Sequence, residues 1–332
     1  MVKVAILSNW HVHAKDYAKE AMARKDIEIV TVWHEQPERG REFAAQLNVP
    51  FEPSLSRVLK RSDIDGVIVT TATVMHPQVI ADAILHKKHV FSEKVLAIKN
   101  EDCTSLVALA RESGIHLMLS LPRLTESPYL TVQSLLDQGR IGQVTHIRCR
   151  VAHDGALPSG PLKSGWLKEE FFEARQTGGG ALIDLGAHPI YLTNRLAGKA
   201  TSLFAAFSYF TKRRVEDHAI VAIEYASGAT GVLETGFISK AGPFELELYG
   251  TKGTLLVQDQ SVRLRSAADG QRYGDAWDDV PLLPALPSPM QQWIAAISAN
   301  ETVHITAQDM IDLTRINVAA YESAAAGKRV TL

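Results

Sequence analysis

A histidine and an aspartate follow a run of three glycines near the middle of the chain. Residues 178–188 read GGGALIDLGAH. A helix that begins after the glycines would place Asp184 and His188, four residues apart, on one face, while the glycines let the backbone approach a ligand closely. A carboxylate beside an imidazole can hold its tautomer and raise its pKa, which suits proton transfer. The alternative is an ordinary Asp in the first turns of a helix that also carries a structural His.

A lysine follows an apolar run in the first half of the chain. Residues 90–97 read VFSEKVLA, so a buried strand would deliver Glu93 and Lys94 to its carboxyl end. Ligands bind at that edge of an open α/β sheet, and a partly desolvated lysine there can give or take a proton. The alternative is an exposed ion pair at the end of a strand.

The elements around these residues change in character near Pro122. Before it, apolar runs alternate with helical stretches, which predicts parallel strands joined by crossover helices. After it, longer β-branched runs predict a large, mostly antiparallel open sheet, with one helix at residues 181–196 and two final helices. We therefore expect an α/β chain: a Rossmann-like doubly wound domain over residues 1–122, and an α+β domain over residues 123–332.

Composition excludes several classes of protein. The chain has 332 residues and a formal net charge of -2, so nothing favours nucleic acid or an anionic membrane as a partner. No apolar stretch approaches 18 residues, and the first residues enter a strand-like run without an export signal. The two cysteines, Cys103 and Cys149, have no metal-ligand spacing and suit a reducing compartment. We expect a cytoplasmic protein.

Together these motifs resemble the glucose–fructose oxidoreductase / inositol dehydrogenase family, Gfo/Idh/MocA. The family's Glu-Lys-Pro is matched by residues 93–95, and its Gly-Gly-Gly with Asp-x-x-x-His by residues 178–188. Looser matches are TATVMH at residues 71–76, Trp166 before the glycines, and YGTKG at residues 249–253. The resemblance implies an enzyme that binds NAD or NADP at the Rossmann-like domain and transfers a hydride to or from a sugar, cyclitol or keto-sugar.

The resemblance also implies roles for individual residues. Lys94 would polarise the reacting oxygen, His188 would be the acid/base, and Asp184 would orient His188 and bind a neighbouring hydroxyl. Substrate hydroxyls would meet Arg123, His153, Asp154 and Trp166 together with Asp184 and His188. The cofactor would meet Ser8, Trp10, His11, His13, His34, Glu35, Arg39, Thr71, Thr73, His76, Glu93 and Lys94.

Three departures from the family pattern affect the cofactor. Ser8, Trp10 and His13 stand where a dinucleotide turn carries its glycines, so the pyrophosphate would sit differently. Glu35 stands one residue late for the acid that binds a ribose diol, and the nearby Arg39 suits a 2′-phosphate; NAD is preferred over NADP. Val95 replaces a proline, so a cis bond is open to loss.

The sequence also leaves alternatives for metal binding and for function, and the resemblance bears on assembly. The added histidines offer an alternative metal set of His11 and His13 with His153 and Asp154, but we expect no metal. The resemblance implies a homodimer or homotetramer built through the open sheet. Two other functions compete: a family member that keeps and recycles its nucleotide for hydrolysis or epimerisation, and a non-catalytic sugar-binding protein on the same fold.

Overall fold

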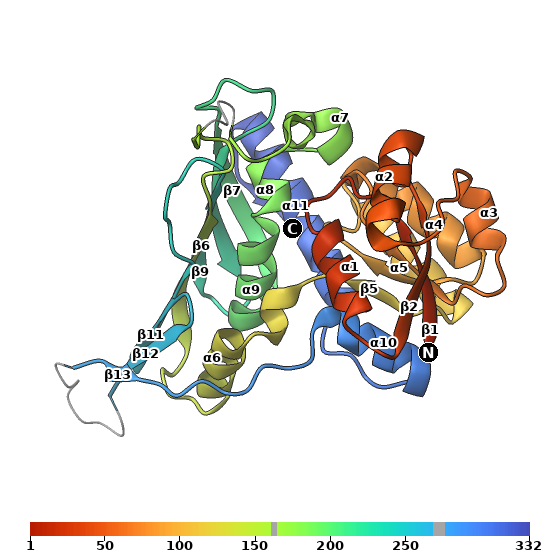
Figure 1. Ribbon diagram of the computed structural model, residues 1–332. Coiled ribbons are helices and arrows are strands. Elements are labelled where there is room, and N and C mark those ends of the chain that lie inside the picture. Colours follow the sequence, from red (N-terminus) through yellow and green to blue (C-terminus); the bar gives the residue numbers. More distant parts are fainter. Residues whose placement is uncertain (161–164, 268–275) are drawn as a thin grey trace. The chain divides into compact units, whose positions relative to one another are not determined.

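The computed structural model describes residues 1–160, 165–267 and 276–332, which form two compact units (Figure 1). Unit 1 comprises Met1–Leu121 and Pro287–Thr314, and unit 2 comprises Pro122–Leu286 and Arg315–Leu332. The first boundary falls where the sequence pattern changes. Residues 287–314 lie within the range predicted for the second domain, but they pack with unit 1.

Unit 1 is built on a five-stranded parallel sheet in the order β2-β1-β3-β4-β5. The strands are β1 Val2–Leu7, β2 Ile27–Trp33, β3 Gly66–Val69, β4 His89–Ser92 and β5 Leu117–Leu119. Every residue of β3 is buried, as expected of a strand covered on both faces. The strand order reverses between β1 and β3, and such a switch point is where open α/β sheets bind ligands. The predicted doubly wound fold is confirmed.

Helices cover this sheet, and one of them comes from far along the chain. They are α1 Ala14–Met22, α2 Pro37–Leu47, α3 Leu55–Lys60, η1 Thr73–Met75, α4 His76–Leu85, α5 Asn100–Ser113 and α10 Pro289–Ala299. Helix α10 packs on β1, β4 and β5 through Trp293, which is fully buried. A Cβ on Gly66 would lie 2.9 Å from this indole, and the indole Nε1 donates to the carbonyl of His116 at 3.1 Å. Trp293 therefore ties the returning segment to unit 1.

Unit 2 is built on a nine-stranded sheet in the order β13-β12-β11-β10-β6-β9-β8-β7-β14. The strands are β6 Val144–Ala152, β7 Ala200–Ser208, β8 His218–Tyr225, β9 Thr230–Gly236, β10 Glu245–Gly250, β11 Gly253–Gln258, β12 Ser261–Ser266, β13 Asp278–Asp279 and β14 Val330–Thr331. Only the pairing of β6 with β9 is parallel; the others are antiparallel. The predicted mostly antiparallel sheet is confirmed, and the side chains of β6 alternate between half-buried and buried from His146 to Ala152.

The helices of unit 2 cover one face of this sheet. They are η2 Pro122–Thr125, α6 Ser127–Asp137, η3 Glu169–Phe172, α7 Ala174–Thr177, α8 Ala181–Asp184 and α9 Ala187–Ala197. Helix α9 packs on β6 and β9, and α8 packs on β8 and β9. The sequence predicted one helix over residues 181–196. This is wrong, because the regular helix is interrupted at Leu185 and Gly186. The amide of Gly186 donates to the carbonyl of Ala181, five residues back, which ends the regular helix.

The last helix, α11 Ala307–Ala326, belongs to both units. Its residues up to Thr314 pack with unit 1, and those from Arg315 pack with unit 2. It is 20 residues long and carries buried polar side chains such as Asn317 and Ser323. Within the described part of the chain, no helix combines the length and the apolar character that crossing a membrane requires.

Candidate active site

The lysine of unit 1 follows directly after β4, at the carboxyl edge of the parallel sheet. Glu93 and Lys94 are both buried, with 1% and 5% of their surface exposed. The amide of Glu93 still donates to the carbonyl of Val69, so the sheet itself fixes where the pair begins. The Lys94–Val95 peptide bond is cis although Val95 is not a proline. The cis bond whose loss the sequence left open is therefore retained.

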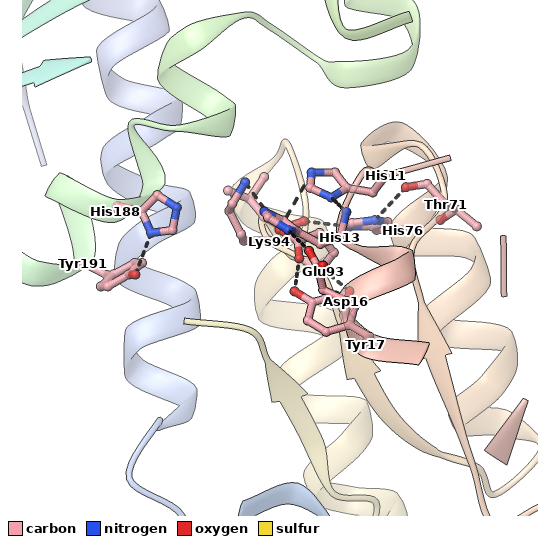
Figure 2. Close-up of polar contacts among 12 residues, drawn as sticks. His11, His13, Asp16, Tyr17, Thr71, His76, Glu93, Lys94, His188 and Tyr191 are labelled. Carbon is pink, nitrogen blue, oxygen red and sulfur yellow. Dashed lines mark hydrogen bonds and ion pairs between the residues drawn. The ribbon is translucent and has the colours of Figure 1, made fainter. Parts of the chain in front are cut away.

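Glu93 is the centre of a group of polar side chains (Figure 2). Its Oε1 lies 3.3 Å from Lys94 Nζ and 3.9 Å from His11 Nε2, and its Oε2 accepts a short hydrogen bond from the Tyr17 hydroxyl. Tyr17 comes from α1 and His11 from the turn before it, so three segments converge on one carboxylate. The exposed ion pair considered from the sequence is excluded, because both partners are buried.

The charges around Glu93 decide its protonation state. Burial by itself would raise the pKa of the carboxyl, but the electrostatic effects of His11, Lys94 and His13 and the hydrogen bond from Tyr17 outweigh it. The result is a pKa lowered to about 2. Burial and the charge of Glu93 in turn raise the pKa of Tyr17, so the phenol keeps its proton and donates it. A negative charge is thus fixed beside the amine of Lys94.

His76, predicted to contact the cofactor, supports the backbone on which Lys94 stands. Its Nδ1 lies 2.7 Å from the carbonyl oxygen of Val95, and its Nε2 lies 3.2 Å from that of Thr71. The side chain is buried, and burial lowers the pKa of its imidazole. The ring therefore bridges the loops after β3 and β4. Thr73 begins the 3-10 turn η1 in the first of these loops.

The turn after β1 contains no glycine, yet its first residue adopts a left-handed backbone conformation. Ser8 has φ 79°, a left-handed conformation in which glycine is usual, and its Oγ accepts the amide of Trp10 at 3.1 Å. The amide of His11 donates to the carbonyl of Thr70, and that of His13 to the Nδ1 of His11. Amides that would face a pyrophosphate in an open turn are thus bonded within unit 1.

Side chains of the same turn offer other contacts for a dinucleotide. Trp10 is buried, whereas the ring of His13 is exposed at the start of α1, 2.9 Å from Asp16 and beside the ring of His11. The buried hydroxyl oxygen of Thr71, after β3, has no hydrogen-bond partner among the described residues. An unsatisfied oxygen at the switch point and a positively polarised helix start fit a bound dinucleotide, with side chains replacing amides around the phosphates.

The residues after β2 lie where a ribose would be expected. His34 is buried, and Glu35 is partly exposed with its carboxylate 3.2 Å from the Nδ1 of His34. Arg39 stands in the first turn of α2 and donates weakly to Gln36 at 3.5 Å. An acid and an arginine are therefore both available at this strand end.

Three of the histidines share one local arrangement. The Nδ1 of His11, His34 and His153 each accepts the backbone amide two residues later, at 3.2, 2.9 and 3.0 Å. Each imidazole closes a tight turn at the end of a strand, as an Asn or Asp side chain does. Their first role is thus to shape a turn. Among the residues that the structure describes, no group of three or more His, Cys, Asp or Glu is placed to hold a metal ion.

In unit 2 two of the three glycines, Gly179 and Gly180, pack against the protein itself. A Cβ on Gly179 would lie 1.9 Å from the hydroxyl of Tyr321, and one on Gly180 would lie 2.0 Å from the carbonyl oxygen of Glu216. The sequence attributed these glycines to close approach of a ligand. The structure corrects this for Gly179 and Gly180, whose missing side chains make room for Tyr321 and Glu216.

Glu216 anchors this glycine loop from a buried position. Its Oε1 accepts the amides of Gly180 and Leu182 at 3.0 Å and the hydroxyl of Tyr321 at 2.6 Å. Burial raises the pKa of Glu216, and these hydrogen bonds offset only part of the rise. The carboxyl holds the start of α8, whose last residue is Asp184. The loop is thereby fixed just ahead of the predicted catalytic pair.

The break between α8 and α9 changes how Asp184 and His188 are presented. They end one helix and begin the next, so the predicted single helix is interrupted between them. The Nδ1 of His188 lies 2.7 Å from the hydroxyl of Tyr191, one turn further along α9 (Figure 2). That hydroxyl also accepts the amide of Arg123 at 3.4 Å.

The other predicted substrate residues lie around the ends of β6 and β9. His153 stacks on Phe237 with ring centroids 5.2 Å apart and lies 4.6 Å from the ring of Trp166. Trp166, 44% exposed, donates its indole N–H to Asp154 at 3.0 Å. These three predicted residues thus form one cluster. The Arg123 side chain instead stacks on Phe244 at 4.2 Å and lies 3.5 Å from Glu126.

The sequence reasoning missed four residues that hold the candidate site. Tyr17, Tyr191, Glu216 and Tyr321 each bond a predicted site residue or its loop. Tyr191 stands three residues after His188, a spacing that predicts contact on a helix. The other three reach their partners from distant parts of the chain, so no local spacing signals them.

Comparisons with known proteins give two family matches and several relatives. Residues 8–121 match the model of an oxidoreductase family with an NAD-binding Rossmann fold, and residues 129–256 match the GFO/IDH/MocA C-terminal domain. The chain is 25% identical to 1,5-anhydro-D-fructose reductase of Ensifer adhaerens, covering 95% of this chain and 94% of that protein. It is also 25% identical to scyllo-inositol 2-dehydrogenase (NAD(+)) of Bacillus subtilis (strain 168), covering 81% and 76%.

A solved structure shares the fold. Levoglucosan dehydrogenase, in complex with NADH and L-sorbose, superposes with a TM-score of 0.83 at 20% identity, covering 99% of this chain and 98% of that one. At this identity the likeness concerns the fold of the two chains. The family model over residues 8–121 is described as an oxidoreductase family, and the two relatives are named as a reductase and a dehydrogenase.

Proposed function

Because the chain belongs to the Gfo/Idh/MocA family of oxidoreductases, we propose that it transfers a hydride between NAD(P) and a sugar, cyclitol or keto-sugar. One observation carries the proposal: the amine of Lys94 is buried beside an ionised Glu93 at the carboxyl edge of the parallel sheet. A buried lysine paired in this way is a charge held at the edge where such sheets bind ligands.

The cofactor would lie along the carboxyl edge of unit 1. The exposed His13 and the start of α1 would meet the phosphates, the Thr71 hydroxyl would bond the nucleotide at the switch point, and Glu35 would bind the ribose. The remaining predicted contacts are Ser8, Trp10, His11, His34, Arg39, Thr73, His76, Glu93 and Lys94. With Glu35 in this position we favour NAD over NADP. Arg39 is the residue that would instead favour NADP.

Two residues of the chain would act on the reacting oxygen. When bound, the nicotinamide gives or takes the hydride. Lys94, held by Glu93, and His188, held by Tyr191, would contact the oxygen and share the polarising and proton-transfer duties. Asp184 would orient the substrate from the end of α8. Arg123 and the cluster of His153, Asp154 and Trp166 would meet other hydroxyl groups of the substrate.

Nucleotide binding and turnover test the proposal directly. We expect NAD or NADP to bind below millimolar concentration, and the nicotinamide absorbance band to change during turnover of a panel of sugars, cyclitols and keto-sugars. Mass analysis of the denatured protein shows whether a nucleotide co-purifies, which would favour the recycling alternative. Absence of binding of either nucleotide at millimolar concentration would exclude the dehydrogenase function.

We also propose a division of labour and an assembly. Residues 1–122 would bind the cofactor, and residues 123–332 would bind the substrate and form a homodimer or homotetramer through the nine-stranded sheet. Exposed Phe204 and Ile220 on β7 and β8 support this, because large apolar side chains on an open sheet face favour a cover. Light scattering on a size-exclusion column should show more than one copy at micromolar concentration. The unpaired, buried Cys103 and Cys149 support a cytoplasmic location.

A further inference from the structure

The hydrogen bonds of the Tyr191 hydroxyl indicate which nitrogen of His188 carries the proton. Tyr191 is 2% exposed, and its hydroxyl has two polar partners recorded in the structure, the backbone amide of Arg123 and the Nδ1 of His188. The amide at 3.4 Å can only donate, so it occupies an acceptor position of the hydroxyl. The 2.7 Å contact with Nδ1 is the shorter and stronger of the two.

A hydroxyl has one proton, and a buried hydroxyl proton without an acceptor is costly. In unit 2 the acceptor that faces the Tyr191 hydroxyl is the Nδ1 of His188. Burial raises the pKa of Tyr191 well above its ordinary value, so the phenol does not lose this proton. The nitrogen that accepts it must carry a lone pair, and in a neutral imidazole the ring proton then lies on Nε2.

We propose that Tyr191 is a positioning residue that fixes His188 as the neutral Nε2–H tautomer, so that His188 donates a hydrogen bond to the carbonyl oxygen of a keto substrate. This rests on the proposed function and sharpens it. Oxidation of an alcohol by His188 would require Nε2 to accept the hydroxyl proton, which a protonated nitrogen cannot do, whereas a carbonyl oxygen offers a lone pair to Nε2–H. The resting enzyme is therefore set for reduction of a keto-sugar or keto-cyclitol.

The same hydrogen bonds assign the proton of the reaction. A neutral imidazole that gave up its Nε2 proton would become an imidazolate, so His188 polarises the carbonyl, as neutral imidazoles do in other enzymes. The nicotinamide would supply the hydride to the carbonyl carbon when bound, and the Lys94 ammonium would give its proton to the carbonyl oxygen and become an amine. This reverses the division of roles that the family resemblance implies for Lys94 and His188.

Imidazole nitrogen resonances test the tautomer without any substrate or nucleotide. Protein carrying ¹⁵N-histidine is studied at about pH 8, where an ordinary imidazole is neutral, and His188→Gln assigns the His188 signals. We expect a protonated Nε2 and an unprotonated Nδ1 in the wild type. In Tyr191→Phe the preference should weaken by about five- to tenfold in population, the equivalent of one ordinary hydrogen bond.

A matched control removes another buried tyrosine hydroxyl from unit 2. Tyr225→Phe, in β8, should leave the His188 signals unchanged. A proton on Nδ1 in the wild type, or identical His188 signals in Tyr191→Phe, would overturn the assignment. The wild-type spectrum alone decides the tautomer if Tyr191→Phe does not fold, and it does so whether or not the protein binds a nucleotide.

Turnover separates donation of a hydrogen bond from transfer of a proton. A glutamine side chain can donate a hydrogen bond but cannot act as an acid, whereas leucine can do neither. With a reducible keto substrate from the panel, we expect the turnover rate of His188→Gln to be at least about tenfold higher than that of His188→Leu. Equal loss in both variants would show that His188 transfers the proton itself and would contradict the neutral-donor role.

Discussion

Each unit holds a buried glutamate that accepts a tyrosine hydroxyl, and the two behave oppositely. Glu93 in unit 1 and Glu216 in unit 2 are 1% and 2% exposed. Glu93 has Lys94 and two histidines around it, and its pKa is lowered to about 2. Glu216 is held by backbone amides and Tyr321, and burial raises its pKa. Desolvation of a carboxylate is thus offset by full charges in unit 1 and incompletely by neutral donors in unit 2.

The difference separates two kinds of support for a site. Glu93 fixes a charge beside the amine of Lys94, which is proposed to act on substrate. Glu216 fixes backbone, because three donors converge on its side chain: the amides of Gly180 and Leu182 and the hydroxyl of Tyr321. The first arrangement suits chemistry, and the second suits the shape of the loop ahead of Asp184.

The largest effect should come from removing the charge that Glu93 holds. Lys94→Met should lower turnover by about 10²- to 10⁴-fold, because the group that is proposed to give the proton is lost. Nucleotide binding, followed by fluorescence titration, should change much less. Lys60→Met, an exposed lysine at the end of α3, is the control and should keep wild-type rates. Comparable rates in Lys94→Met and Lys60→Met would show that the Lys94 amine is not needed for the chemical step.

Neutralising Glu93 should destabilise the protein only where the carboxylate is ionised. Its pKa falls from 4.5 to about 2 on folding, so its contribution is present above pH 4.5 and is lost as the pH falls toward 2. In Glu93→Gln the free energy of unfolding at pH 7 should drop by on the order of 3 kcal/mol, and the deficit should narrow below pH 4.5. Urea unfolding across this range measures it, with the exposed Glu101→Gln as control.

Neutralising Glu216 should show the opposite pH dependence. Its pKa is raised on folding, so the native protein loses stability as the pH rises from the ordinary value of 4.5 through the raised value. Glu216→Gln should lower the free energy of unfolding by about 1–3 kcal/mol at pH 4, because the NH₂ group of glutamine would face hydrogen-bond donors. The difference in unfolding free energy between the variant and the wild type should narrow as the pH rises. A deficit that widens with pH would show that Glu216 is stabilised as an anion, like Glu93.

The two tyrosine hydroxyls should give effects no larger than those of the two carboxylates. Tyr17→Phe removes a donor from a charged acceptor and should cost about 1.5–3 kcal/mol at pH 7. Tyr321→Phe should cost about 1 kcal/mol, because the amides of Gly180 and Leu182 continue to bond Glu216. Thermal unfolding of the two variants compares them. A larger loss of stability in Tyr321→Phe than in Tyr17→Phe would contradict this comparison. It would show that the hydroxyl bonded to Glu216 stabilises the protein more than the hydroxyl bonded to Glu93.

The sequence by itself determined the architecture, since periodicity is a local property of the chain. Alternating elements before Pro122 and β-branched runs after it specified a parallel and a mostly antiparallel sheet, and the run ending at Ser92 placed Glu93 and Lys94 at a sheet edge. The family motifs were equally visible, because their residues lie close together in the chain.

Tertiary structure alone decided what these residues contact. Spacing predicted one helix for Asp184 and His188, but Gly186 approaches the backbone of Leu182 and the helix breaks there. The glycines face Glu216 and Tyr321, which are 36 and 141 residues distant from Gly180. Burial, and with it the opposite pKa shifts of Glu93 and Glu216, depends on neighbours that only folding brings together, so no local pattern could reveal it.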